Sequence, residues 1–348
     1  MIRVLVVDDS AIVRKVLTEA LSSEPDIEVV GTAPDPFVAR DKILALKPDV
    51  LTLDIEMPRM DGVTFLKRLM HFQPLPVIVI SSLGVASSRC TMEALAAGAV
   101  DVLAKPGGPQ SVGELRMNLA AKVRAAAAAR VRRADPAVTA PTPQRASPPV
   151  PAEPRRFDAS TLIAIGASTG GTEAIQKVLL QLPEDCPGVV ITQHIPPVFS
   201  RSFAERLDSL CSMRVREAVD GDRVEAGLAL VAPGNLHMLV RRAGDGYRVE
   251  VKDGPLVCYQ RPAVDLLFRS VAQAAGAHAV GAILTGMGAD GAQGLLAMKQ
   301  AGARTIAQDE ASCVVFGMPR EAIKVGAVDR VLPLQAIGTA LLSEARRT

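Results

Sequence analysis

Three polar residues, each at the end of an apolar run, have the types needed to hydrolyse an ester. Ser168 lies within GASTG at 166–170, which fits the G-x-S-x-G spacing that exposes a serine hydroxyl on a strand-to-helix turn. His194 and Asp290 each follow another apolar run. A hydroxyl, an imidazole and a carboxylate are the nucleophile, base and orienting acid of serine hydrolases. The three residues are therefore candidates for a catalytic triad.

Each member of this triad also has a simpler explanation. The serine pentapeptide alone fits the phosphate-binding turn of a dinucleotide fold, or a connection without chemistry. A nucleotide site requires an acid at the end of the next strand, but Gln193 and His194 stand there. Asp290 could instead cap a helix over 293–300. Isolated histidines are more often structural, which is the expectation for His71, His237 and His278.

A second group of chemical residues lies in the first third of the chain. Asp8 and Asp9 follow the first apolar run, and Asp54 follows the third. Carboxylates held together repel one another unless a hard cation such as Mg²⁺ lies among them. The alternative is that Asp8 and Asp9 only cap a helix that begins near Ser10.

Two further residues are expected beside these carboxylates. Lys105 follows the fifth apolar run and could bring its ammonium group to the same pocket. Ser81 ends the fourth run, and Ser82 replaces it if the register of that strand is shifted by one residue. The joint placement of acids, a lysine and a hydroxyl at four strand ends is hard to obtain by helix capping alone.

The elements that position these residues are predicted from the alternation of short apolar runs with helical stretches. This pattern predicts an α/β fold with a mostly parallel sheet in each half, and the carboxyl ends of parallel strands share one edge. Alternation and turn pairs over 235–253 predict an antiparallel hairpin beside the second sheet. The predicted strands are Ile2–Val7, Ile27–Gly31, Val50–Leu53, Val77–Ser81, Val100–Leu103, Thr161–Ile165, Val189–Thr192, Leu228–Ala232, Ala279–Leu284, Thr305–Ala307 and Val328–Val331.

The two halves are separated by a stretch of different composition. Seven prolines and almost no large apolar residue occur between residues 134 and 156, after an Ala/Arg stretch that could prolong the preceding helix. Such proline density favours an extended linker. The expected organisation is a first domain over 1–123, a flexible linker over 124–157 and a second domain over 158–348.

Composition excludes several classes of protein. The 348 residues are 49% hydrophobic, and 39 Lys plus Arg against 37 Asp plus Glu give no electrostatic reason to expect nucleic-acid binding. No apolar run reaches the ~18 residues of a membrane span, and the first residues lack a signal-peptide pattern, so we expect a cytoplasmic protein without membrane insertion. The five cysteines form no CxxC pair, which favours buried thiols over a zinc site or disulfides.

The first domain resembles the flavodoxin-like receiver domain of two-component response regulators. The resemblance is carried by VLVVDDSAIVRKVL, LTLDIEMPRMDG and LAKP, and it covers about residues 1 to 120. It implies that Asp54 accepts a phosphoryl group from a histidine kinase, while Asp8, Asp9 and Asp54 hold Mg²⁺. It further implies that Lys105 contacts the phosphoryl oxygens and that Ser81 is the switch hydroxyl.

The second domain, over about 160 to 345, resembles the chemotaxis protein-glutamate methylesterases, the CheB family. GASTGG, ITQHIP, LVAPGNLHM and LTGMGADGAQGL carry this resemblance, and the order Ser, His, Asp differs from the order in α/β-hydrolases. The resemblance implies a doubly wound esterase domain that demethylates glutamate γ-methyl esters, and deamidates glutamines, on methyl-accepting chemoreceptors. It implies no cofactor for ester hydrolysis, and control by a receiver that covers the cleft until phosphorylated.

Two other functions compete with this interpretation. In a signalling scaffold the second domain would only bind receptors or a kinase, and Ser168 would be incidental. A transcription factor is a weaker alternative, because no basic recognition helix or helix-turn-helix pattern follows the linker.

Overall fold

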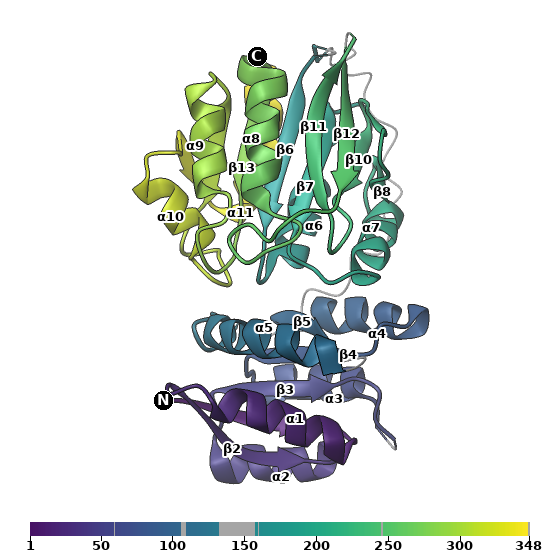
Figure 1. Ribbon diagram of the computed structural model, residues 1–348, viewed down its shortest axis with the longest axis vertical. Helices are drawn as coiled ribbons and strands as arrows, with labels where there is room; N and C mark the ends of the chain where they lie inside the picture. The colour runs from purple at the N-terminus through teal and green to yellow at the C-terminus, as the bar shows by residue number, and fades with distance from the viewer. Residues whose placement is uncertain (59, 106–108, 132–156, 159, 245, 347–348) are drawn as a thin grey trace.

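The computed structural model of the chain describes residues 1–348 except 59, 106–108, 132–156, 159, 245 and 347–348. Two α/β units follow one another along the long axis of the molecule, the N-terminal unit at the bottom of Figure 1. None of the helices in the described part of the chain combines the length and apolar character that crossing a bilayer requires. The proline-rich segment predicted as a linker lies outside the described residues.

The N-terminal unit is built on a parallel five-stranded sheet with the order β2-β1-β3-β4-β5. This is the flavodoxin-like order. Strands are added on one side of β1 and then on the other, and this change of side between β1 and β3 leaves a crevice at the carboxyl ends of the strands. The five predicted strands are confirmed to within two residues at each end. The elements are β1 (Ile2–Val7), α1 (Ala11–Ser22), β2 (Ile27–Ala33), α2 (Pro36–Leu46), β3 (Val50–Asp54), α3 (Gly62–Phe72), β4 (Val77–Ser81), α4 (Val85–Ala96), β5 (Asp101–Ala104) and α5 (Pro109–Ala127).

The C-terminal unit contains a parallel seven-stranded sheet with the order β15-β14-β13-β6-β7-β10-β8. The chain starts in the centre at β6, builds outward through β7, and later returns to β13 on the other side of β6. This reversal makes a second switch point. The elements are β6 (Leu162–Ala167), α6 (Gly171–Leu179), β7 (Gly188–Gln193), α7 (Phe199–Leu210), β8 (Arg214–Glu217), β9 (Arg223–Val224), β10 (Leu228–Val231), β11 (His237–Ala243), β12 (Gly246–Lys252), α8 (Val264–Ala275), η1 (Gly276–His278), β13 (Ala279–Ile283), α9 (Ala292–Gln300), β14 (Arg304–Gln308), α10 (Met318–Lys324), β15 (Arg330–Leu332) and α11 (Leu334–Ala345).

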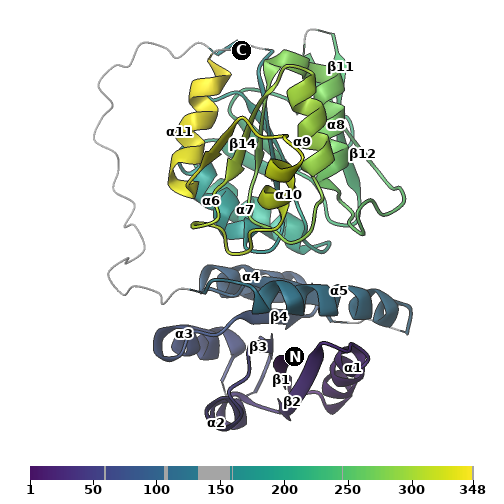
Figure 2. The same cartoon turned by 90° about the vertical axis from the view of Figure 1, so that its left-hand side faces the viewer.

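Helices cover both faces of this sheet (Figure 2). Successive residues of a strand point to opposite faces, so Ile163 and Ile165 of β6 pack under α6, α7 and α11, whereas Leu162 and Ala164 pack under α8 and α9. Both sets are fully buried. The continuous apolar sequence of β6 follows from this double burial.

The predicted antiparallel hairpin is confirmed as β11 and β12, which pair from His237↔Lys252 to Ala243↔Gly246. One residue of its predicted turn, Asp245, lies outside the described residues. The hairpin gains a third strand, because β12 also pairs with β9. Strands β8 and β9 are absent from the prediction, since their short sequences carry charges and no apolar run.

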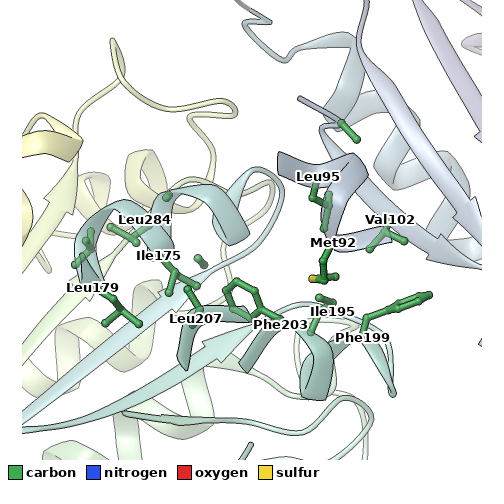
Figure 3. Packing of buried hydrophobic residues seen from close by; sticks show 14 of the residues in the cluster. Met92, Leu95, Val102, Ile175, Leu179, Ile195, Phe199, Phe203, Leu207 and Leu284 are labelled. Atoms are coloured by element: carbon green, nitrogen blue, oxygen red, sulfur yellow. The ribbon is translucent and has the colours of Figure 1, made fainter. Parts of the chain in front are cut away.

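The two units share an apolar contact. Helix α4 packs against α7, and Met92 and Leu95 of the N-terminal unit belong to the same buried cluster as Ile195, Phe199 and Phe203 of the C-terminal unit (Figure 3). Figure 2 shows the α4 and α5 face turned toward the other unit. The N-terminal unit therefore lies against the helix that follows His194 in the chain.

The cysteines differ in part from expectation. All five are free, as predicted. Cys186 and Cys313 are buried, and burial raises the pKa of each thiol to about 12. The prediction of buried thiols is wrong for Cys90 and Cys258, which are exposed because each lies on the outer side of a helix or turn.

Candidate active site and phosphoacceptor site

The sheet of the C-terminal unit brings together the three residues of the predicted triad. Ser168 directly follows β6, His194 directly follows β7, and Asp290 lies in the loop after β13. The Nδ1 atom of His194 is 3.0 Å from the Oγ atom of Ser168, and its Nε2 atom is 2.8 Å from Oδ2 of Asp290. All three side chains are buried. A continuous hydrogen-bonded path therefore runs from hydroxyl to carboxylate.

The turn that carries Ser168 depends on glycine. The N–H of Ser168 donates to the carbonyl oxygen of Thr285 at 3.0 Å, which ties the start of the turn to the loop after β13. A Cβ atom on Gly171 would lie 2.1 Å from Oε1 of Gln193, and one on Gly286 would lie 2.7 Å from the Cβ of Ser168. Only glycine therefore allows the two loops to close around Ser168.

The carboxylate of Asp290 has a different role from that of a cap on its own helix. Gly291 is the N-cap of α9, while Asp290 accepts hydrogen bonds from the N–H groups of Val264 and Asp265 at the start of α8. Burial acts to raise the pKa of Asp290, but the hydrogen bond and charge of His194 and the two N–H donors outweigh it and lower the pKa. Asp290 is therefore ionised at neutral pH and oriented toward the imidazole.

The predicted acidic residues also meet at a strand edge. Lys105 Nζ lies 2.7 Å from Oδ2 of Asp54 and 3.2 Å from Oδ2 of Asp8. Burial is the main reason that the pKa of Asp54 rises to about 6, with Asp8 adding to it and Lys105 partly opposing it. Burial likewise raises the pKa of Asp8. One lysine thus leaves the charge of the pocket only partly balanced.

The carboxylate group fits a hard divalent cation. Oxygen atoms of Asp8, Asp9 and Asp54 lie within 4.8 Å of one another, as ligands of one ion would. Oδ2 of Asp8 is buried, and the ammonium group of Lys105 that lies 3.2 Å from it is shared with Asp54. Helix capping does not explain the acids, because Ser10 itself caps α1 through a hydrogen bond from the N–H of Val13. Three carboxylates that face a single ammonium group suit a divalent cation among them.

The two serine candidates at the end of β4 are placed differently. Asp54 pairs in register with Ile80, so Ser81 lies one residue beyond it at the same edge, fully buried. The hydroxyl of Ser82 instead donates to Glu56 at 3.0 Å. Ser81 thus lies at the edge that the sequence predicted for it, its role as the switch residue stays a prediction, and no hydrogen bond joins its hydroxyl to Asp54 among the described residues.

Comparison with known proteins assigns the whole chain. Residues 163–341 match the CheB methylesterase domain, and residues 4–115 match the response regulator receiver domain. A Syntrophus aciditrophicus protein named protein-glutamate methylesterase/protein-glutamine glutaminase 2 is 59% identical over 97% of this chain and 97% of its own length. The chain belongs to the CheB methylesterase family. It is accordingly a carboxylic ester hydrolase joined to a receiver domain.

Other members of the CheB methylesterase family agree in extent and fold. The protein-glutamate methylesterase/protein-glutamine glutaminase of Salmonella typhimurium is 54% identical over 99% of this chain and 97% of its own length. The crystal structure of the Thermotoga maritima CheB methylesterase catalytic domain is 36% identical, covers 53% of this chain and 97% of that domain, and gives a TM-score of 0.52. The esterase fold of this chain is therefore that of the family.

One residue of this CheB-family site was not predicted to take part. Gln193, at the end of β7, is buried, and its Nε2 atom donates to the carbonyl oxygens of Ser168 at 2.8 Å and His194 at 3.3 Å. One side-chain amide thus connects the backbones of Ser168 and His194. The signal in the sequence was a polar residue at the end of a buried strand, immediately before the candidate base.

Proposed function

We propose that this chain hydrolyses glutamate γ-methyl esters on the cytoplasmic helices of methyl-accepting chemoreceptors, and deamidates selected glutamines there. The observation that carries the proposal is the hydrogen-bonded path from Ser168 through His194 to Asp290. Relatives that cover nearly the whole chain bear the corresponding names. The reaction consumes water and yields a glutamate carboxylate with methanol, or with ammonia when glutamine is the substrate.

In the first half of the reaction, the Oγ atom of Ser168 attacks the ester carbonyl carbon while Nδ1 of His194 takes the hydroxyl proton. The tetrahedral intermediate collapses, the carbon–oxygen bond to methoxide breaks, and the imidazolium gives its proton to that oxygen. Methanol leaves and an acyl-serine remains. Because Asp290 is ionised and hydrogen-bonded to Nε2, it stabilises the positive imidazolium at both proton transfers.

In the second half, water attacks the acyl-serine and gives its proton to His194, which returns it to Ser168 as the serine leaves. Free glutamate carboxylate is released. The imidazole presents Nδ1 to the nucleophile, the opposite ring edge from that used in chymotrypsin-like triads. The chemistry is unaffected, because either ring nitrogen can act as base when the other donates to a carboxylate.

We further propose that Asp54 is the phosphoacceptor and that a chemotaxis histidine kinase supplies the phosphoryl group. Mg²⁺ held by Asp8, Asp9 and Asp54 would balance phosphoryl charge, the chemistry that such a cation supplies in phosphoryl transfer. Lys105 already lies at 2.7 Å from Asp54 and would contact the phosphoryl oxygens. Ser81, one residue beyond the register partner of Asp54, would follow the change as the switch hydroxyl.

The proposed control is that the receiver domain hinders the esterase until Asp54 is phosphorylated. Two contacts reach the residues next to the nucleophile. The hydroxyl of Thr169 donates to Oδ2 of Asp101 at 2.7 Å, and the N–H of Gly170 donates to the carbonyl oxygen of Val100 at 3.2 Å. A pocket of about 620 Å³ lies between the end of α5 and the loop that precedes Asp290. These contacts support a packed arrangement from which phosphorylation shifts the population.

The decisive experiment incubates the full chain with receptor membranes that carry radiolabelled methyl esters, with and without a small phosphodonor, and counts volatile methanol. Ser168→Ala is expected to lower release at least about a thousandfold while receptor binding is retained. Ser209→Ala, an exposed serine on α7, is the matched control and should release methanol at the wild-type rate. Methanol release by Ser168→Ala at the wild-type rate would refute the proposed nucleophile.

A further inference from the structure

A rigid turn projects from the esterase domain between β12 and α8. Val257 and Gln260 form an antiparallel bridge, with N–H to carbonyl hydrogen bonds of 3.1 and 2.9 Å in the two directions. Between them, Cys258 and Tyr259 have φ values of 51° and 62°. Two consecutive residues with positive φ define the tight hairpin turn in which asparagine and glycine are the usual residues.

Side chains from outside the turn hold it in place. The buried ring of His237 lies 2.9 Å from the carbonyl oxygen of Pro255 through Nε2, and its Nδ1 atom accepts from the N–H of Ala263 at 3.3 Å. Arg261 donates twice to Oδ1 of Asn235, at 3.0 and 2.8 Å, and once to the carbonyl oxygen of Gly254 at 2.6 Å. Both ends of the loop are therefore fixed.

The residue at the tip gains little from the rest of the chain. Tyr259 is 84% exposed, so its ring buries almost no surface. A side chain in the left-handed region is strained, and glycine would remove that strain. The strained backbone at Tyr259 is not offset by packing of its side chain within the chain. Such strain points to a function in binding another molecule. An exposed aromatic ring on a rigid support is also the type of side chain that dominates binding at protein interfaces.

The turn lies beside the triad. The thiol of Cys258, an acid oxygen of Asp265 and one of Asp290 lie within 4.8 Å of one another. The other left-handed non-glycine residues described in the esterase domain, Val198 and Asn235, also lie in loops after strands that end at this edge. From the Cys258 thiol, Asp290 and His194 lead to Ser168 through successive contacts of at most 4.8, 2.8 and 3.0 Å.

We propose that the turn Val257–Gln260 is a docking element for the receptor helix that carries the ester, with Tyr259 as its anchor. This inference rests on the proposed function. Its ring would pack against an apolar side chain of the receptor helix near the methylated glutamate. Because Tyr259 is exposed with the receiver domain in place, the docking element is open in the packed arrangement. Docking is thereby separated from access to Ser168, which the receiver domain controls.

The test compares two substrates on the phosphorylated full chain: a methylated receptor cytoplasmic fragment, and p-nitrophenyl acetate, which is too small to reach the turn. Tyr259→Gly is expected to raise KM for the receptor fragment about tenfold with little change in kcat. Hydrolysis of the small ester should stay within about twofold, and the melting temperature should be unchanged or higher because the strain is relieved. Tyr259→Phe keeps the ring and should retain the wild-type KM.

Leu180→Ala is the control, because Leu180 is a 47%-exposed apolar residue that follows α6, away from the triad edge of the sheet. It should leave both substrates unaffected. An unchanged KM in Tyr259→Gly, or an equal loss on both substrates, would overturn the docking proposal while leaving the esterase intact. Wild-type protein that hydrolyses neither substrate would instead remove the proposed function on which docking rests.

Discussion

The triad and the acidic pocket are built in the same place of two similar sheets, yet their electrostatics are opposite. Both lie at the carboxyl ends of parallel strands near a switch point. In the esterase domain Asp290 accepts three hydrogen bonds, and its pKa is lowered. In the receiver domain burial raises the pKa of Asp54 to about 6 and also raises the pKa of Asp8, and the two carboxylates share one lysine.

The difference teaches what each site requires. A hydrolase gains rate when its charges are oriented before the substrate arrives, so the carboxylate that supports His194 is fully satisfied in advance. Under the proposed phosphoacceptor role, the pocket of Asp54 has to take up a cation and a phosphoryl group, so its carboxylates gain from negative charge that is not balanced beforehand. The complete hydrogen bonding of Asp290 and the unbalanced negative charge around Asp54 therefore each suit the function proposed for their site.

The largest expected effect comes from breaking the complete site. Asp290→Asn keeps the shape but removes the charge that stabilises the imidazolium, and we expect kcat for methyl ester hydrolysis to fall about 10⁴-fold. Asp329→Asn is the matched control, because Asp329 accepts hydrogen bonds from Thr305 at the opposite edge of the sheet. It should cost stability but leave kcat within about twofold. A loss in Asp290→Asn below about tenfold would contradict preorganisation by this carboxylate.

The next largest effect is expected from the amide that holds the backbones of Ser168 and His194 together. Gln193→Met removes the amide that joins the carbonyl oxygens of Ser168 and His194, so we expect kcat to fall about 10–100-fold with KM nearly unchanged. Thr192→Val is the control, since Thr192 precedes it on β7 and its buried hydroxyl has no hydrogen-bond partner among the described residues. Steady-state kinetics decide the matter, and a rise in KM with unchanged kcat would exclude a positioning role.

The third prediction links the two sites. Met92→Lys places a charge in the buried contact between α4 and α7, so the unphosphorylated full chain should gain about tenfold in esterase rate. The phosphorylated chain should gain little, because its receiver domain is already displaced under the proposal. Phe72→Ala, at the exposed end of α3, is the control and should change neither rate. Equal rates for wild type and Met92→Lys would argue against control by packing.

Much of both sites could be predicted because it depends on strand ends. Continuous apolar runs give the strands, and parallel strands bring their carboxyl ends to one edge, which is sufficient to gather Ser168, His194 and Asp290. The same reasoning gathers Asp8 and Asp54. The elements that were missed, β8 and β9, carry alternating charges over two to four residues and give no apolar signal.

What could not be predicted depends on contacts between distant segments. The double hydrogen bond of Gln193 depends on where the carbonyl groups of two adjacent strand ends point, which no spacing encodes. Asp290 has the composition of a cap for its own helix, yet it accepts from the start of α8. The exposure of Cys258 follows from a left-handed turn held by remote residues. Packing of the two domains is likewise set by apolar surfaces and not by linker composition.

The smallest predicted effect is the pH dependence of receiver-domain stability that follows from the unbalanced charge of Asp54. The pKa of Asp54 is about 6 in the folded chain, above the ordinary aspartate value of 3.8, so between these pH values the folded state binds more protons than the unfolded state. Stability therefore falls as pH rises through this window, and above pH ~6 ionised Asp54 costs about 3 kcal/mol. Asp54→Asn should remove that cost, stabilising the receiver transition at pH 8 and losing its advantage toward pH 4.

Calorimetry of the full chain across this pH range, without and with Mg²⁺, measures the cost of ionised Asp54 and its reduction by the cation. Added Mg²⁺ should stabilise wild-type receiver at pH 8 more than Asp54→Asn, because the cation balances the charge that the variant lacks. Asp61→Asn serves as the control, because the pKa of Asp61 is shifted in the opposite direction from that of Asp54. A hydrogen bond from the N–H of Thr64 lowers the pKa of Asp61, so its loss of charge should not stabilise at pH 8. Destabilisation by Asp54→Asn at pH 8 would mean that Lys105 already balances the pocket, and the contrast between the two sites would disappear.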